Sequence, residues 1–261
     1  MKRLYKNLFL MSLALLVVVL SSCSGSDYLN AIPKKSTALI SVDLQQMASD
    51  KNAEDKAGML KSLLHVDDVD KCGIDISEKL YLFESADGNL GLCAKVSDEG
   101  MWKTGLPRLQ EAHCFGSEGA QRLSFRCLEG FVACGFSGQA LLVMGPVVAD
   151  AQAQLQQQMV KFLKAEEEDG ITVSPMYERL QTLSSPMAMV AQAQALPEKF
   201  VAPFTLGAPK DTDPSQVVIA ADMEVKDGIL QIQGETSPLM KPSTRRCRRR
   251  YKTIVLSRAV M

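Results

Sequence analysis

Hydrophobic and polar residues alternate along much of this chain, with the two-residue spacing that is typical of β-strands. In residues 37–44 the alternation includes several β-branched residues and predicts a largely buried strand. Further strands are predicted at 80–84, 90–96, 123–127, 132–136, 140–144, 187–195, 217–225 and 229–234. Glycine turns at Gly88, Gly130 and Gly228 link six of these strands into hairpins.

The hairpin around Gly130 also has a predicted register. Counting back across this turn pairs Cys127 with Val132, Phe125 with Cys134, and Leu123 with Phe136. All six residues would then face one side of the sheet, with Phe125 in the core and Arg126 in water.

A spacing of three and four residues predicts helices in other parts of the chain. Residues 56–65 carry an apolar stripe, and a helix that begins near Ser97 is interrupted by Pro107. Pro146 is expected to open the longest helix, whose apolar stripe is Val148, Ala151, Leu155, Met159, Phe162 and Leu163. A short helix follows Ser174, and prolines between 197 and 214 indicate a loop.

Together these elements predict an α+β fold, in which an antiparallel sheet of hairpins has helices packed on one face. We divide the fold into a first half, 37–170, and a second half, 171–240. Each half has a strand introduced by proline and a later Asp-Gly hairpin, so the halves are candidates for a repeat, although their spacing differs.

The start of the chain has the pattern of a bacterial lipoprotein signal. Basic residues precede an apolar run from Leu8 to Leu20, which is followed by Ser21, Ser22 and Cys23. Thirteen residues form a helix of about 20 Å, too short to span a bilayer comfortably. A retained signal anchor and ordinary secretion are the alternatives.

We therefore predict that residues 1–22 are a cleaved signal peptide and that Cys23 is lipidated. Residues 23–36 would form a lipidated tether. Its acyl chains, such as palmitate, would anchor the protein to a bacterial envelope membrane, and an outer-membrane location is expected. Whether it faces the periplasm or the exterior is left open.

The charge distribution separates the body of the chain from its ends. The formal net charge is −1, but residues 7–240 contain 18 basic and 30 acidic residues, a net −12. Such a body disfavours nucleic acid as a partner. Residues 241–261 contain eight basic residues and are expected to form a disordered tail outside the fold, translated from a shifted reading frame. In that case the last predicted strand, 229–234, would lie at an exposed edge.

The sequence resembles an uncharacterised family of envelope lipoproteins from Bacteroides-type bacteria. The resemblance rests on residues 28–33 with 37–44, on 73–77 with 81–83, and on 91–98. It covers roughly residues 28–145 and implies a lipoprotein ectodomain, but it implies no reaction. Members of this family are usually much longer than this chain.

Residues that could carry catalysis or bind a metal are few. Asp68, Asp70 and Gly73 resemble a calcium loop, but Cys72 and Lys79 occupy two of its ligand positions, so we expect no metal. The two histidines, His65 and His113, lack a suitable partner, and no nucleophile, phosphate or dinucleotide motif occurs. Six cysteines besides Cys23 are interpreted as buried thiols. They are Cys72, Cys93, Cys114, Cys127, Cys134 and Cys247.

We therefore expect a lipid-anchored envelope protein that is non-catalytic and needs no cofactor. Its expected contacts are the membrane, through Cys23, and an envelope protein or glycan. The alternative is a hydrolase that uses two carboxylates on glycans, which would require two facing carboxylates roughly 5–10 Å apart in a cleft.

Overall fold

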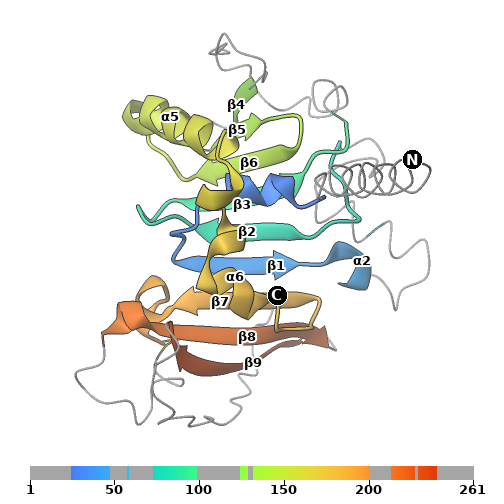
Figure 1. Cartoon of the computed structure of the whole chain (residues 1–261), viewed down its shortest axis with the longest axis vertical. Helices are drawn as coiled ribbons and strands as arrows, with labels where there is room; N and C mark the ends of the chain where they lie inside the picture. Colours follow the sequence, from blue (N-terminus) through green and yellow to red (C-terminus); the bar gives the residue numbers. More distant parts are fainter. Residues whose placement is uncertain are drawn as a thin grey trace, which may run out of the picture.

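Nine strands form one antiparallel sheet at the centre of the computed structural model (Figure 1). The structure describes residues 25–47, 73–98, 124–128, 132–199, 213–226 and 229–239, together with Gly58 and Val201. The strands are β1 (Ala38–Val42), β2 (Leu80–Glu84), β3 (Leu90–Lys95), β4 (Ser124–Leu128), β5 (Val132–Phe136), β6 (Ala140–Gly145), β7 (Met187–Gln192), β8 (Val217–Lys226) and β9 (Ile229–Pro238). Their order across the sheet is β4-β5-β6-β3-β2-β1-β7-β8-β9.

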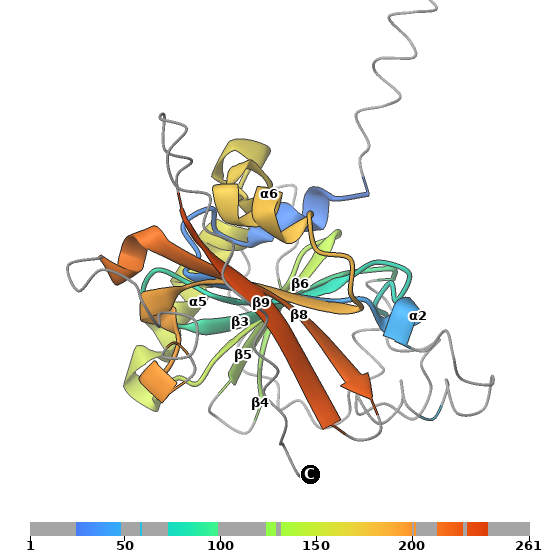
Figure 2. The ribbon, with the colours of Figure 1, turned by 90° about the horizontal axis from the view of Figure 1, so that it is seen from below.

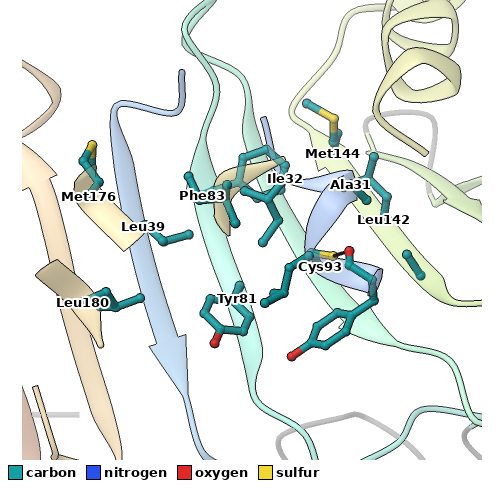
Figure 3. Close-up of a cluster of buried hydrophobic side chains, with 14 of the residues drawn as sticks. Ala31, Ile32, Leu39, Tyr81, Phe83, Cys93, Leu142, Met144, Met176 and Leu180 are labelled. Carbon is teal, nitrogen blue, oxygen red and sulfur yellow. Dashed lines mark hydrogen bonds between the residues drawn. The ribbon is translucent and has the colours of Figure 1, made fainter. Parts of the chain in front are cut away.

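One face of the sheet, which we call the first face, carries the larger hydrophobic core. Leu39, Phe83 and Val190 lie on adjacent strands at paired positions and are all buried in this core. The core also includes residues of η1 (Asp27–Ala31), α5 (Gln152–Leu163) and α6 (Pro175–Leu180) (Figure 3). Figure 2 shows α6 and η1 on the same side of the sheet.

Further short helices connect these elements. They are α2 (Leu44–Met47), η3 (Ala149–Ala151), η4 (Glu167–Asp169), η5 (Ile171–Val173), η6 (Ala193–Ala195) and η7 (Pro214–Gln216). No helix in the described ranges is long and apolar enough to cross a bilayer.

The longest described helix starts later than the sequence indicated. It was expected from Pro146, but α5 begins at Gln152, after the 3-10 turn η3. Because β6 runs to Gly145, residues 146–148 lie in the connection that returns the chain over the first face, and Val148 is 69% exposed. Leu155, Met159 and Leu163 are buried as predicted.

The register predicted for the hairpin of β4 and β5 is wrong by one residue. Phe125 pairs with Gly135, not Cys134, and Cys127 pairs with Ala133, not Val132. Leu128 pairs with Val132, so the connection holds one residue fewer than assumed, and each residue of β4 faces a different partner. Phe125 and Cys127 therefore lie on the opposite face of the sheet from Val132, Cys134 and Phe136, and Leu123 lies outside the described residues.

The antiparallel pairing of β1 with β7 is centred on one residue pair. Ile40 of β1 pairs with Met189 of β7, and the remaining pairs of these strands are arranged symmetrically about this one. The flanking hydrogen bonds obey the same symmetry: Asp43 N donates to Pro186 O at 2.7 Å, and Gln192 N donates to Thr37 O at 2.8 Å. The β1–β2–β3 unit lies on one side of this contact and the β7–β8–β9 unit on the other, and each unit is antiparallel with its strands in chain order.

The predicted fold class is thus confirmed at the level of an α+β protein built on an antiparallel sheet. The β2–β3 hairpin has the expected turn, in which Gly88 adopts a φ of 79°. The predicted signal peptide and Cys23, the helix at 56–65, the helix after Ser97 and the tail 241–261 lie outside the described residues.

Candidate functional site

The opposite face of the sheet, which we call the second face, carries a continuous row of small and aliphatic residues. Eight adjacent strands each contribute one residue at a paired register position. In spatial order these are Cys134, Val143, Leu92, Leu82, Ile40, Met189, Ala221 and Gly234. Because side chains alternate between the faces of a strand, this row is separate from the first-face core.

The second face is only partly shielded from solvent. Leu82 lies near the middle of the row and is 41% exposed. Leu90 lies on the same face of β3, two residues before Leu92, and is 57% exposed. A smaller hydrophobic cluster covers the end of the face where β1 terminates. This cluster includes Val42, Leu44, Val96 and Phe136, with Met47 and Ile74 packed against them. The exposed leucines therefore lie beside a buried apolar region.

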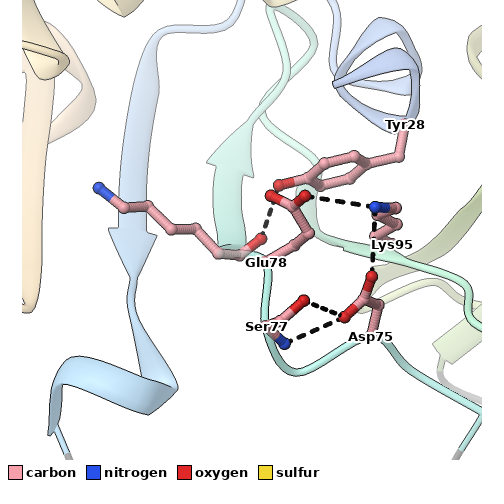
Figure 4. Close-up of polar contacts among 6 residues, drawn as sticks. Tyr28, Asp75, Ser77, Glu78 and Lys95 are labelled. Carbon is pink, nitrogen blue, oxygen red and sulfur yellow. Dashed lines mark hydrogen bonds and ion pairs between the residues drawn. The ribbon is translucent and has the colours of Figure 1, made fainter. Parts of the chain in front are cut away.

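A polar cluster lies below η1, beside the first-face core (Figure 4). Lys95 Nζ is 3.2 Å from Asp75 Oδ2 and 3.2 Å from Glu78 Oε1. The Ser77 hydroxyl and backbone N–H both donate to Asp75 Oδ1. Tyr28 adds a hydrogen bond from its hydroxyl to Lys79 O at 2.9 Å. These contacts hold the turn before β2 against η1 and β3.

The protonation of this cluster follows from its contacts. The hydrogen bonds from Ser77, together with Lys95, hold the pKa of Asp75 below its ordinary value despite the opposing effect of burial. Burial alone would lower the pKa of Lys95, but its hydrogen bonds to Asp75 and Glu78 outweigh this effect and raise it. Asp75 is thus stabilised as an anion, whereas a carboxylic acid that donates a proton near neutral pH needs a raised pKa.

Three tyrosines pack in a line beside this cluster. The ring centroids of Tyr28 and Tyr81 are 6.3 Å apart, and those of Tyr81 and Tyr177 are 6.4 Å apart. Burial raises the pKa of all three phenols, so each is neutral at physiological pH. Tilted aromatic pairs at these distances are typical of packing in a core.

A shallow depression of about 590 Å³ lies between η1 and the end of α5. Its lining includes Asn30 and Pro33 on one side and Val160, Lys164 and Asp169 on the other. Lys34 Nζ is 2.7 Å from Asp169 Oδ1 beside it, with both side chains largely exposed. The lining contains both lysines and acidic residues, so the depression presents no single sign of charge to a ligand.

Two of the cysteines examined in the sequence can be placed as side chains. Cys93 and Cys134 are buried thiols, as predicted, and Cys93 Sγ donates to Tyr28 O at 3.4 Å. Burial raises the pKa of Cys93, which disfavours the reactive thiolate. Within the ranges that the structure describes, no group of three or more His, Cys, Asp or Glu side chains is placed to hold a metal ion. Cys23, His65, Asp68, Asp70 and His113 lie outside these ranges.

Comparison with family models, curated proteins and solved structures finds no match for this chain.

The sequence reasoning missed the apolar second face. The signal was present in β2, where Leu80, Tyr81, Leu82 and Phe83 are consecutive large apolar residues. Such a run predicts a strand that is apolar on both faces, whereas strict alternation predicts one apolar face. The helices pack on the first face, so they cover only one of the two apolar faces of this strand.

Proposed function

We propose that this chain is a lipid-anchored protein of the bacterial cell envelope, held through Cys23, that acts by binding a partner and not by catalysis. The observation that carries the proposal is the sequence of the first 23 residues, in which basic residues, an apolar run and Ser-Ser-Cys follow one another. The resemblance to envelope lipoproteins of Bacteroides-type bacteria supports the same compartment. Acyl chains at this cysteine would provide the anchor.

The second face favours a protein partner over a glycan. Its exposed residues, Leu82 and Leu90, are aliphatic, and they adjoin a buried apolar cluster. Exposed aliphatic patches are typical of surfaces that contact other proteins. The carboxylates of the polar cluster do not favour hydrolysis, because Lys95 contacts both Asp75 and Glu78.

The lipid anchor is tested by replacing its cysteine. We expect Cys23→Ala to abolish incorporation of labelled fatty acid and to shift the protein from the membrane fraction to the soluble fraction or to an uncleaved precursor. Ser24→Ala is the matched control, since it changes the neighbouring residue and keeps the thiol. If Cys23→Ala still takes up labelled fatty acid, the proposal of lipidation at Cys23 is wrong.

A further inference from the structure

The proposed lipid anchor at Cys23 is very close in the chain to the first buried residues. The sequence predicts a tether at 23–36, whereas η1 lies within this range and packs into the first-face core. Tyr28, Leu29 and Ile32 are at most 3% exposed. Lengthening the tether by detaching η1 would expose these large side chains to water. The connection between the anchor and the fold is therefore only a few residues long.

The chain just before η1 is also held against the fold. A Cβ atom at Gly25 would lie 3.2 Å from Glu78 Oε1 and 3.4 Å from Lys95 Nζ, so the backbone here contacts the polar cluster. Leu29 N donates a hydrogen bond to Ser26 O at 2.9 Å. Figure 4 shows this cluster below η1. The chain thus enters the fold beside the polar cluster.

This entry point lies at one end of the sheet. Strand β1 ends at Val42, which pairs with Leu80 at the start of β2 and with Met187 at the start of β7. Lys95 is the last residue of β3 and pairs with Ala140, the first residue of β6. We call this end of the sheet, where β1 and β3 terminate and β2, β6 and β7 begin, the anchor end.

The exposed side chains in the described turns of the anchor end are polar. They include Gln45, Gln46, Ser77, Ser97 and Gln139. Such side chains can form hydrogen bonds with water and with lipid headgroups, whereas their burial in hydrocarbon is costly. The anchor end therefore fits the surface of a bilayer and not its interior.

The short connection limits how far the anchor end can lie from the membrane. With its acyl chains in the hydrocarbon, a lipidated Cys23 would lie at the inner boundary of the headgroups. The headgroup layer of one leaflet is about 5–8 Å thick. Two extended residues reach about 7 Å. Gly25 can therefore lie no farther out than about the outer surface of the headgroups.

We infer that the anchor end of the sheet contacts the lipid headgroups, so that the fold stands directly on the bilayer. This inference rests on the proposed lipidation of Cys23. The opposite ends of β2 and β3, with the turn at Gly88, then point away from the membrane, because β3 alone spans about 20 Å. The second face stands upright on the bilayer, and a partner on this face binds close to the membrane.

Fluorine labels at the two ends of β3 test the orientation. 4-Trifluoromethylphenylalanine replaces either Ser97, at the anchor end, or Ala86, in the turn before β3, and both positions are exposed. The full chain is expressed in a bacterium, purified with its lipid and placed in nanodiscs of phosphatidylethanolamine and phosphatidylglycerol. Some of the headgroups carry a gadolinium chelate, which speeds fluorine relaxation by an amount that falls steeply with distance.

We expect the relaxation enhancement at position 97 to exceed that at position 86 by about tenfold or more, because the length of β3 separates the two labels by about 20 Å. An enhancement at position 86 that equals or exceeds the enhancement at position 97 overturns the inference.

A longer tether tests whether the short connection sets the orientation. Ten Gly and Ser residues inserted between Ser24 and Gly25 keep the lipidation signal and add a flexible coil of about 17 Å. We expect the enhancements at the two labelled positions to become nearly equal in this variant. A ratio that is unchanged by the insertion overturns the inference.

Incorporation of labelled fatty acid, measured on the same preparations, separates this inference from the proposed function. A chain that carries no fatty acid overturns the lipidation and the inference together. A lipidated chain with equal enhancement at the two ends of β3 overturns the inference alone.

Discussion

At the scale of single residues, the first-face core accommodates polar atoms by giving them backbone partners. The hydroxyl of Tyr28 donates to Lys79 O, and Cys93 Sγ donates to Tyr28 O. Phe83 fills the space above Gly91, its cross-strand partner, where a Cβ atom would meet the phenyl ring. These contacts join η1, β2 and β3, and they make the neutral forms of Tyr28 and Cys93 part of the folded structure.

The raised pKa of Tyr28 predicts how stability falls at alkaline pH. In the unfolded chain a tyrosine ionises near pH 10, whereas burial keeps Tyr28 neutral in the fold. Stability is therefore present below about pH 10 and is lost above it, by about 1.4 kcal/mol per pH unit for each such phenol. We expect Tyr28→Phe to lose about 1 kcal/mol at pH 7 with the hydrogen bond and to show a shallower decline above pH 10.

Denaturant titrations of both proteins between pH 7 and pH 11.5 measure this difference. Parallel stability curves above pH 10 would mean that Tyr28 ionises as readily in the fold as in the unfolded chain.

At the scale of elements, α6 shows how a very short helix is stabilised. Six residues are too few for a stable isolated helix. The Ser174 hydroxyl caps its start by accepting a hydrogen bond from Tyr177 N at 3.1 Å, and Pro175 fixes the first turn. Met176 and Leu180 then bury the helix against the first face. The cap was recognisable in the sequence, but the packing was not.

We expect Ser174→Ala to lower the free energy of unfolding by about 0.5–2 kcal/mol, because Tyr177 N loses its acceptor at a buried position. Ser174→Thr keeps a hydroxyl and serves as the control. Thermal and urea unfolding of the purified variants measure the effect. If the alanine variant is as stable as the threonine variant, the hydrogen bond at the helix start contributes nothing.

At the scale of the whole molecule, the inner strands of the sheet differ from its end strands in how they are paired. Strands β1 and β7 are inner strands with at least two strands on either side, and Leu39 and Val190 at their contact are fully buried. Strand β4, at one end, pairs with β5 alone within the described part of the sheet. Strands β1 and β7 are therefore each paired on both sides, whereas β4 is paired on one side.

This arrangement predicts a gradient in amide hydrogen exchange. The amides of β1 and β7 should exchange slowest, with protection close to the global free energy of unfolding, and those of β4 should exchange fastest. Exchange followed by mass spectrometry under native conditions gives the order. Equal rates in β1 and β4 would contradict a sheet that is more stable in its inner strands than at its edge.

Local sequence patterns were enough to predict strands, a helix cap, a turn and a lipoprotein signal. The period of two in 37–44 arises from the alternation of side chains along an extended backbone, which is a local property. The cap at Ser174 and the turn at Gly88 are likewise local, because each depends on the conformation of a few neighbouring residues. The signal at Cys23 can also be read locally, although its processing stays a prediction.

The tertiary structure was needed to establish which strands are neighbours and what each face of the sheet contacts. The pairing of β1 with β7 joins residues about 150 positions apart, and no local pattern specifies it. The register of β4 and β5 depends on the length of their connection, and an error of one residue exchanged the partners of Phe125 and Cys134. The continuous row of apolar residues across the second face exists only because separate strands align, so it could be found only in the assembled sheet.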